Sequence, residues 1–116
     1  MVGLGRKNQG FSDVKIKDLG GEPPARTNLD DPFVKIVVDE ALPVYGKPMS
    51  IVPMVGGSGP NYCFIHDLHL PVVTAGLGYP GSRVHAPNEN IRIDLYLKAS
   101  QHIVRIINAF SEKFPL

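Results

Sequence analysis

Residues 79–93 have the sequence YPGSRVHAPNENIRI, and the segments on either side of this stretch decide the fold. The preceding residues 71–77 are almost continuously apolar, which is typical of a strand buried on both faces of a sheet. The following residues 94–113 predict an amphipathic helix. Between them the backbone is restricted by Gly78, Pro80, Gly81 and Pro87. A loop held by a strand and a helix is a common place for functional side chains.

The loop carries one histidine, His85, and Glu89 follows it four residues later. Histidine is the commonest metal ligand in proteins, so His85 is a candidate metal ligand. A solvent-exposed loop histidine without any ligand is the competing interpretation. The residue pattern alone leaves both open.

A first helix is predicted to begin at Asp31-Pro32, because an acidic N-cap residue precedes a proline at the first helical position. The helix is expected to end or kink near Leu42, since Pro43 would cost about 3 kcal/mol in a helix interior. Gly46 then closes the segment. Spacings of three and four place the following apolar residues on one face: Phe33, Val34, Val37, Val38 and Ala41.

Further elements follow from the same patterns. Strands are predicted at residues 12–19 and 49–55, and a short helix at about residues 61–67. The connecting residues 56–60, GGSGP, are either a tight turn or a place where backbone N–H groups meet an anion, and both interpretations stay open. From residue 31 onward the order is helix, strand, helix, strand, helix. This order predicts an α/β fold, with helices flanking a mixed or mostly parallel sheet.

The predicted last helix has an apolar stripe made of Ala99, Ile103, Ile106, Ile107, Phe110 and Phe114. His102 flanks this stripe and is expected at the surface. Cys63 is expected to be a small core residue. Its spacing to His66 and His69 invites a zinc interpretation, but no second pair of ligands lies nearby. We therefore interpret these three residues as structural.

Composition excludes several function classes. The chain has 116 residues, a formal net charge of +1 and a single cysteine. Such a balanced charge does not favour a nucleic-acid or membrane-surface partner. No apolar run approaches the roughly 18 residues that span a bilayer. A lone cysteine forms no internal disulfide and is compatible with the cytoplasm, which is the expected location.

Three blocks carry a resemblance to a known family: residues 56–60, residues 71–78 and residues 85–93, the last with the sequence HAPNENIRI. Over about residues 11–116 the chain resembles the C-terminal part of the co-catalytic zinc aminoacylases and peptidases. That family includes acetylornithine deacetylase, succinyl-diaminopimelate desuccinylase, carnosinase-type dipeptidases and glutamate carboxypeptidase. The resemblance implies that residues 1–26 are a remnant of an inserted ferredoxin-like lid or dimerisation domain. Residues 27–116 would then be the C-terminal half of the catalytic domain.

The resemblance also implies roles for particular residues. His85 falls where the family has a zinc-binding histidine. The turn that lines the family's substrate pocket corresponds to Gly56, Gly57 and Ser58. Arg26 falls near an arginine that can meet a substrate carboxylate. Asn88 and Glu89 would orient the ligand histidine or fix its loop.

The implied reaction is hydrolysis of an amide bond in dipeptides or in N-acyl or N-succinyl amino acids. Two Zn²⁺ ions serve each site in the family, with Co²⁺ or Mn²⁺ as alternatives. The family's His-x-Asp motif and its Glu-Glu pair, which holds the general base, do not occur in this sequence. We therefore expect the chain to bind zinc weakly, to be inactive alone, and to need the missing N-terminal half as a partner. A stand-alone, non-catalytic α/β module is the alternative, and in both cases we expect a homo-oligomer.

Overall fold

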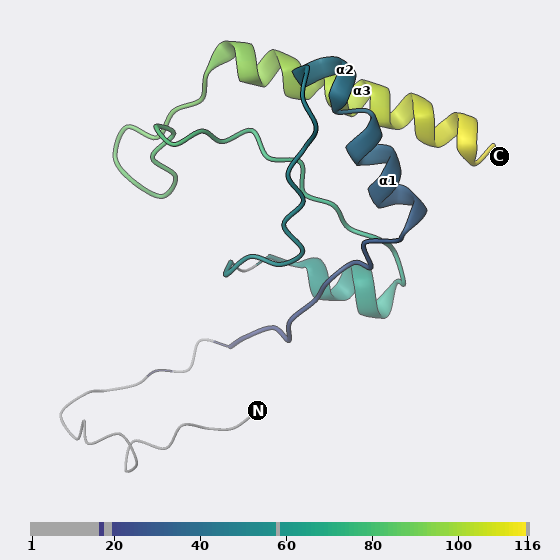
Figure 1. The fold of residues 1–116 in the computed structure, drawn as a ribbon. Coiled ribbons are helices and arrows are strands. Elements are labelled where there is room, and N and C mark those ends of the chain that lie inside the picture. Colours follow the sequence, from purple (N-terminus) through teal and green to yellow (C-terminus); the bar gives the residue numbers. More distant parts are fainter. Residues whose placement is uncertain (1–16, 18–19, 58, 116) are drawn as a thin grey trace.

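The computed structural model describes residue 17, residues 20–57 and residues 59–115. It contains the helices α1 (Pro32–Asp39), α2 (Leu42–Tyr45) and α3 (Ile93–Lys113), and the π-helical segment η2 (Cys63–Asp67). Figure 1 shows α1 and α2 lying beside α3, with long irregular segments between them and η2. None of the helices in these ranges is long and apolar enough to cross a membrane. The predicted strand at residues 12–19 lies outside the described residues, apart from Lys17.

The beginning of α1 confirms the predicted helix start. The Asp31 side chain accepts a hydrogen bond from the backbone N–H of Phe33 at 2.8 Å, and Pro32 is the first helical residue. The break near Pro43 is also confirmed, although α1 ends at Asp39 and the proline lies inside the single turn of α2. Gly46 ends α2 with a left-handed φ of 70° and donates its N–H to the Leu42 carbonyl at 2.9 Å. A residue with a Cβ would be strained at that φ.

The core lies where α1 and α2 pack against α3. Its buried apolar side chains are Val34, Ile36, Val37, Ala41 and Ala99. The first turn of α1 meets the end of α3, where the rings of Phe33 and Phe110 pack edge to face at 5.9 Å. The last turn of α1 meets the middle of α3. The two helices therefore run past each other in opposite directions.

The prediction that His102 lies at the surface is wrong. Its side chain is fully buried, and Nε2 lies 2.8 Å from the carbonyl oxygen of Val37. That carbonyl is in the last turn of α1, where backbone oxygens have no partner within the helix. The sequence pattern misses this role because it classes every histidine as polar. In the folded chain, the imidazole of α3 caps the end of α1 instead.

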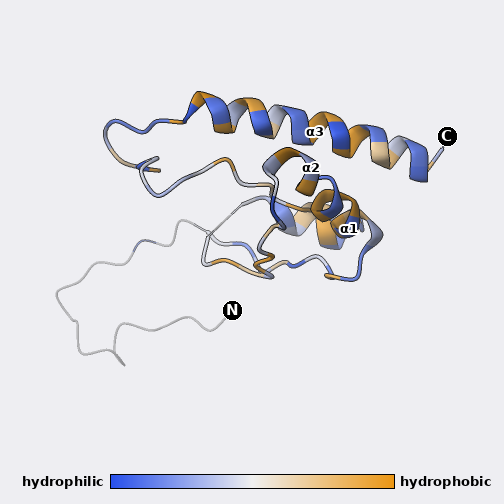
Figure 2. Ribbon diagram, turned by 45° about the horizontal axis from the view of Figure 1, so that its top comes forward, coloured by the Kyte–Doolittle hydropathy of each residue, from blue (hydrophilic) through white to orange (hydrophobic). Residues whose placement is uncertain are grey.

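Helix α3 has a second apolar face that the described residues leave uncovered. Its buried side includes Ala99 and His102, whereas Ile103 and Ile107 of the predicted stripe remain 53% and 61% exposed. Figure 2 shows apolar residues along the length of α3. Several further large apolar side chains of α3 are about half exposed or more: Ile93, Tyr96, Leu97 and Val104.

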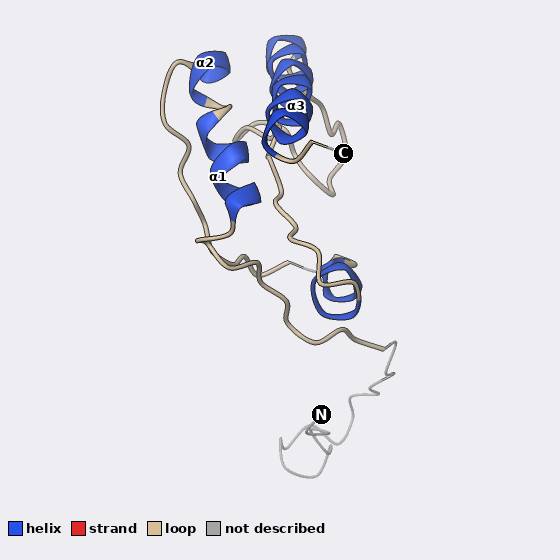
Figure 3. Cartoon of the chain, turned by 90° about the vertical axis from the view of Figure 1, so that its right-hand side faces the viewer, coloured by secondary structure: helices blue, strands red, loops and turns tan. Residues whose placement is uncertain are grey.

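The segments at residues 49–55 and 71–77 are not strands in the described part of the chain (Figure 3). Residues 71–77 are half-buried or exposed, not buried on both faces as predicted. A strand needs a neighbouring backbone to pair with, and here a side chain takes that place. The Thr27 hydroxyl donates to the Val72 carbonyl at 2.7 Å and accepts from the Val72 N–H at 2.9 Å. The α/β class stays a prediction for the complete domain.

The predicted helix at residues 61–67 is present, but its last five residues form the π-helical segment η2. Figure 3 shows it standing apart from α1, α2 and α3. Cys63 is therefore exposed, and its predicted core position is wrong.

Candidate functional site

The loop that carries His85 is held together by its own side chains. We call residues 79–90 the histidine loop. The Tyr79 hydroxyl is hydrogen bonded to Oδ1 of Asn90, which closes the loop at its base. Ser82 is buried, and its hydroxyl donates to the Tyr79 carbonyl at 2.6 Å. The backbone N–H of Asn90 donates to the Ser82 carbonyl at 3.0 Å. These bonds give the loop a defined shape although it contains no helix or strand.

His85 lies between these anchoring residues with its side chain exposed. Its backbone has a φ of 61°, and two further non-glycine residues of the loop, Arg83 and Asn88, have φ values of 53° and 62°. Left-handed φ values are uncommon for residues with a Cβ and persist only where the surroundings enforce them. The ring of His85 has no hydrogen-bond partner among the described residues, so both nitrogens remain open to a ligand.

One imidazole does not make a metal site. No group of three or more His, Cys, Asp or Glu side chains comes together within the described ranges. His66, one of the three residues whose spacing invited a zinc interpretation, stacks on the Tyr62 ring, with the ring centroids 4.4 Å apart. Structural zinc sites have four protein ligands and catalytic ones three. The described part of the chain therefore fits one ligand of a metal ion and does not fit a complete zinc site.

The predicted supporting residues of His85 have backbone roles in the loop. Asn88 accepts a hydrogen bond through its carbonyl, and the Glu89 N–H donates to the Ala86 carbonyl at 3.2 Å. Both side chains are exposed. The role of their side chains in orienting the ligand histidine stays a prediction.

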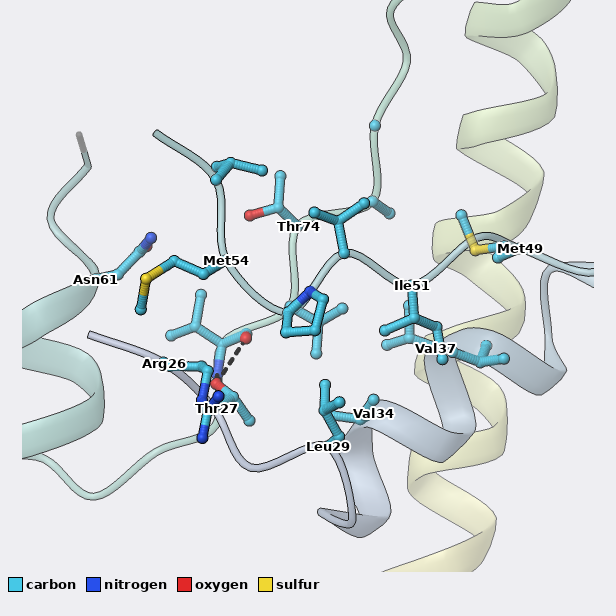
Figure 4. A pocket seen from close by; sticks show the side chains of 18 of the residues that line it. Arg26, Thr27, Leu29, Val34, Val37, Met49, Ile51, Met54, Asn61 and Thr74 are labelled. Carbon is cyan, nitrogen blue, oxygen red and sulfur yellow. Dashed lines mark hydrogen bonds between the residues drawn. The ribbon is translucent and has the colours of Figure 1, made fainter. Parts of the chain in front are cut away.

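A pocket of about 410 Å³ lies beside α1, between the irregular segments that precede and follow η2. Figure 4 shows its labelled side chains, with Arg26 and Thr27 on one side and Ile51 beside Val37 of α1 on the other. Arg26 is the charged residue of the lining, and most other contributors are aliphatic. The lining includes Val34, Val37, Val38, Val52, Val55, Val72 and Ala75. A guanidinium at the edge of an apolar pocket suits a ligand with a carboxylate next to an apolar group.

The structure places the predicted substrate residues in different surroundings. Arg26 and Gly57 both line this pocket, whereas Gly56 does not, and Ser58 lies outside the described residues. His85 is not part of the lining. The structure therefore brings Arg26 and Gly57 together and leaves the histidine loop separate from them.

The two glycines of the turn are not required by the packing of the described residues. Neither has a left-handed φ. A Cβ added at Gly56 would meet nothing within 4 Å, and one at Gly57 would approach only Cγ2 of Val55, at 3.9 Å. This is ordinary van der Waals distance. The absence of side chains at this turn therefore leaves open backbone beside the pocket.

Sequence reasoning missed Tyr79, Ser82 and Asn90, which shape the histidine loop. All three lie within residues 79–93, but the sequence pattern assigns none of them a role. A weak signal was available, because Asn, Ser and Tyr can all bond to nearby backbone or to each other in loops. Which of the several polar residues would do so depends on the path of the chain.

An ion pair marks the point where the loop enters α3. Nη2 of Arg92 lies 2.8 Å from Oδ2 of Asp94. The hydrogen bond from Arg92 is the main reason that the pKa of the Asp94 carboxyl lies below its ordinary value, and the same bond raises the pKa of Arg92. Asp94 is in the first turn of α3, where a negative charge interacts favourably with the helix dipole.

The sequence profile of Peptidase family M20/M25/M40 matches residues 2–109. The chain belongs to this family. A solved structure supports the assignment: the M20 family metallo-carboxypeptidase Sso-CP2 from Sulfolobus solfataricus, with 36% sequence identity and a TM-score of 0.69. The match covers 74% of this chain and 20% of the carboxypeptidase, so the chain spans about a fifth of the length of that relative. No curated protein sequence matches the chain.

Proposed function

We propose that this M20 family chain contributes to a metal-dependent hydrolase that cleaves amide bonds in dipeptides or N-acyl amino acids. The observation that carries the proposal is the 36% identity to a metallo-carboxypeptidase over 74% of the chain. In this proposal, His85 supplies one metal ligand from the histidine loop. The remaining ligands and the general base come from family segments that the sequence does not contain.

The pocket beside α1 supports a role in substrate recognition. Amino acids released by a peptidase or deacylase carry a carboxylate, and Arg26 offers a planar donor that can bind it through two hydrogen bonds. The aliphatic lining suits an apolar side chain or acyl group. Gly57 presents bare backbone at the same pocket, where a substrate can approach closely. Desuccinylase, deacetylase and dipeptidase activity all fit these features.

The experiment measures hydrolysis of dipeptides and N-acyl amino acids in the presence of Zn²⁺, Co²⁺ or Mn²⁺. The chain alone should give no turnover, whereas co-expression with an N-terminal part of an M20 enzyme should restore it. In the active complex, His85→Ala should abolish activity and His66→Ala should not. Clear turnover by the chain alone would contradict the assignment of a single metal ligand.

The same complex tests the role of Arg26. Its replacement by alanine should raise KM for substrates with a free carboxylate and leave KM for the corresponding amides unchanged. Equal KM changes for both substrate types would mean that Arg26 does not bind the carboxylate. Lys47→Ala serves as the control, since Lys47 is an exposed cation that does not line the pocket.

A second function, a non-catalytic module that assembles with copies of itself, is favoured by the exposed apolar surface. Among the described residues, nineteen large apolar side chains are at least 42% exposed, while only five apolar side chains are buried. Contiguous apolar patches are typical of association surfaces, and the uncovered face of α3 is the candidate for such a patch. Sedimentation and metal binding separate the two proposals. A stable homo-oligomer whose zinc affinity does not change in His85→Ala would favour the non-catalytic module.

A further inference from the structure

We propose that Asn90, together with Tyr79, acts as a positioning residue that fixes the backbone on both sides of His85. The inference rests on the proposed function, because it takes His85 to be a metal ligand. The clasp itself, defined here as the side chains of Tyr79 and Asn90, stands on contacts within the histidine loop.

The side-chain amide of Asn90 is bonded at both of its ends. Its Nδ2 donates to the carbonyl of Gly81 at 3.1 Å and to the carbonyl of Asn88 at 3.0 Å. Its Oδ1 is the partner of the Tyr79 hydroxyl. Gly81 lies four residues before His85 and Asn88 lies three residues after it. A single amide group therefore ties together the two chain segments that carry the histidine.

The bonding pattern requires an amide at position 90. An asparagine offers two N–H donors and a carbonyl acceptor, and both functions are used here. An aspartate could still accept from Tyr79, but it could not donate to the two backbone carbonyls. Hydrogen bonding thus distinguishes these two residues although their shapes are nearly the same.

The Tyr79 ring is also held in place by its surroundings. A Cβ added at Gly81 would lie 2.5 Å from Cε2 of the ring, so only glycine lets the ring take this position. The guanidinium of Arg92 also lies 6.0 Å from the ring centroid. This arrangement is favourable because the ring face carries partial negative charge.

The loop needs such a clasp because its backbone is strained. Arg83, His85 and Asn88 all have left-handed φ values. Such φ values are unfavourable for residues with a Cβ, so an unrestrained loop would relax to other conformations. The clasp spans this strained stretch from Tyr79 to Asn90. Releasing it should change the direction of the His85 ring without disturbing the distant core of α1 and α3.

The experiment compares Asn90→Ala, Asn90→Asp and Tyr79→Phe in the complete chain, with Asn108→Ala on α3 as the matched control. Amide hydrogen exchange reports on the loop through the bonded N–H groups of Ala86 and Glu89. Loss of the Asn90 bonds should raise exchange at these two amides by about 5–30-fold. Asn90→Asp should give an intermediate increase, and Tyr79→Phe a smaller one.

A second measurement follows the ring itself. Zn²⁺ is titrated into each variant while the ring NMR signals of the four histidines are recorded, so that His66, His69 and His102 are internal references. In Asn90→Ala, the His85 signals should move before zinc is added, and the zinc-induced change should require more metal. The urea midpoint and the signals of His102 should remain as in the control variant. A general loss of structure would instead change the His85 signals, the His102 signals and the urea midpoint together.

The outcomes separate this inference from the proposed function. Unchanged loop exchange and unchanged His85 signals in Asn90→Ala would overturn the clasp. If His85→Ala binds zinc as well as the parent chain does, the metal-ligand role fails. The exchange data would then still decide whether the clasp exists.

Discussion

Replacing His102 by alanine is the most direct test of how this chain holds its helices together. The imidazole is fully buried between α1, α2 and α3, and it caps the Val37 carbonyl at 2.8 Å. It also packs edge to face against the Tyr45 ring, with the ring centroids 5.6 Å apart. Alanine removes the hydrogen bond and the ring contact and leaves a cavity.

The size of the effect follows from these contacts. Truncating a buried ring costs about 3–5 kcal/mol, which includes the cavity. Leaving the Val37 carbonyl without a donor adds to this cost, by about 1–3 kcal/mol. One term acts in the opposite direction, because Nδ1 of His102 is buried without a hydrogen-bond partner. Removing that unpartnered nitrogen stabilises the variant by about as much as the unpartnered Val37 carbonyl destabilises it. We therefore expect the free energy of unfolding to fall by about 3–5 kcal/mol in total.

The assay is urea unfolding followed by helical circular dichroism. With a slope of about 1–3 kcal/mol per molar urea, the midpoint should fall by at least about 1 M. His102→Gln keeps an N–H donor and fills part of the space, so it should unfold between alanine and the parent chain. Gln101→Ala is the control, because Gln101 is the exposed residue next to His102 on the same helix. Equal midpoints for His102→Ala and Gln101→Ala would refute the capping role.

Three further predictions concern the helix start, the glycine turn and the ion pair. Asp31→Ala should destabilise the chain by about 0.5–2 kcal/mol in urea unfolding, because it removes the bond to the Phe33 N–H, while Asp31→Asn should lose little. Gly57→Ala should change the free energy of unfolding by no more than about 0.5 kcal/mol, since a Cβ finds room there, and a larger loss would mean that packing requires the glycine. Arg92→Ala should raise the pKa of Asp94 towards its ordinary value in an NMR titration, and an unchanged midpoint would exclude the bond. Because the pKa of Asp94 is lowered, the contribution of this pair to stability is present above the ordinary pKa and is lost as the pH falls through the lowered one.

The local signals in the sequence were sufficient for the start of α1 and for both ends of α3. The Asp31-Pro32 start and the long helix predicted at residues 94–113 agree with α1 and α3 to within one residue. These predictions succeed because caps and prolines act on neighbouring residues, whatever the rest of the chain does. The family resemblance also followed from the sequence alone, because it depends on the order and spacing of motifs.

Burial could not be obtained in the same way. Cys63 was expected inside and is exposed, while His102 was expected outside and is fully buried. Burial depends on which elements pack against each other, and a polar ring is buried where it caps a carbonyl that would otherwise lack a donor. The predicted strands depend on a neighbouring backbone, and the described residues supply none for them.

For the histidine loop, the sequence by itself determined that a candidate ligand lies between a glycine- and proline-rich turn and a helix. Only the tertiary structure decided which polar residues shape that loop. Asn88, Glu89 and Asn90 are similar in sequence terms, yet of these three only Asn90 has a side chain that makes the hydrogen bonds closing the loop. The physical reason is that a hydrogen bond requires distance and direction, and both are set by the path of the whole loop and not by the type of one residue.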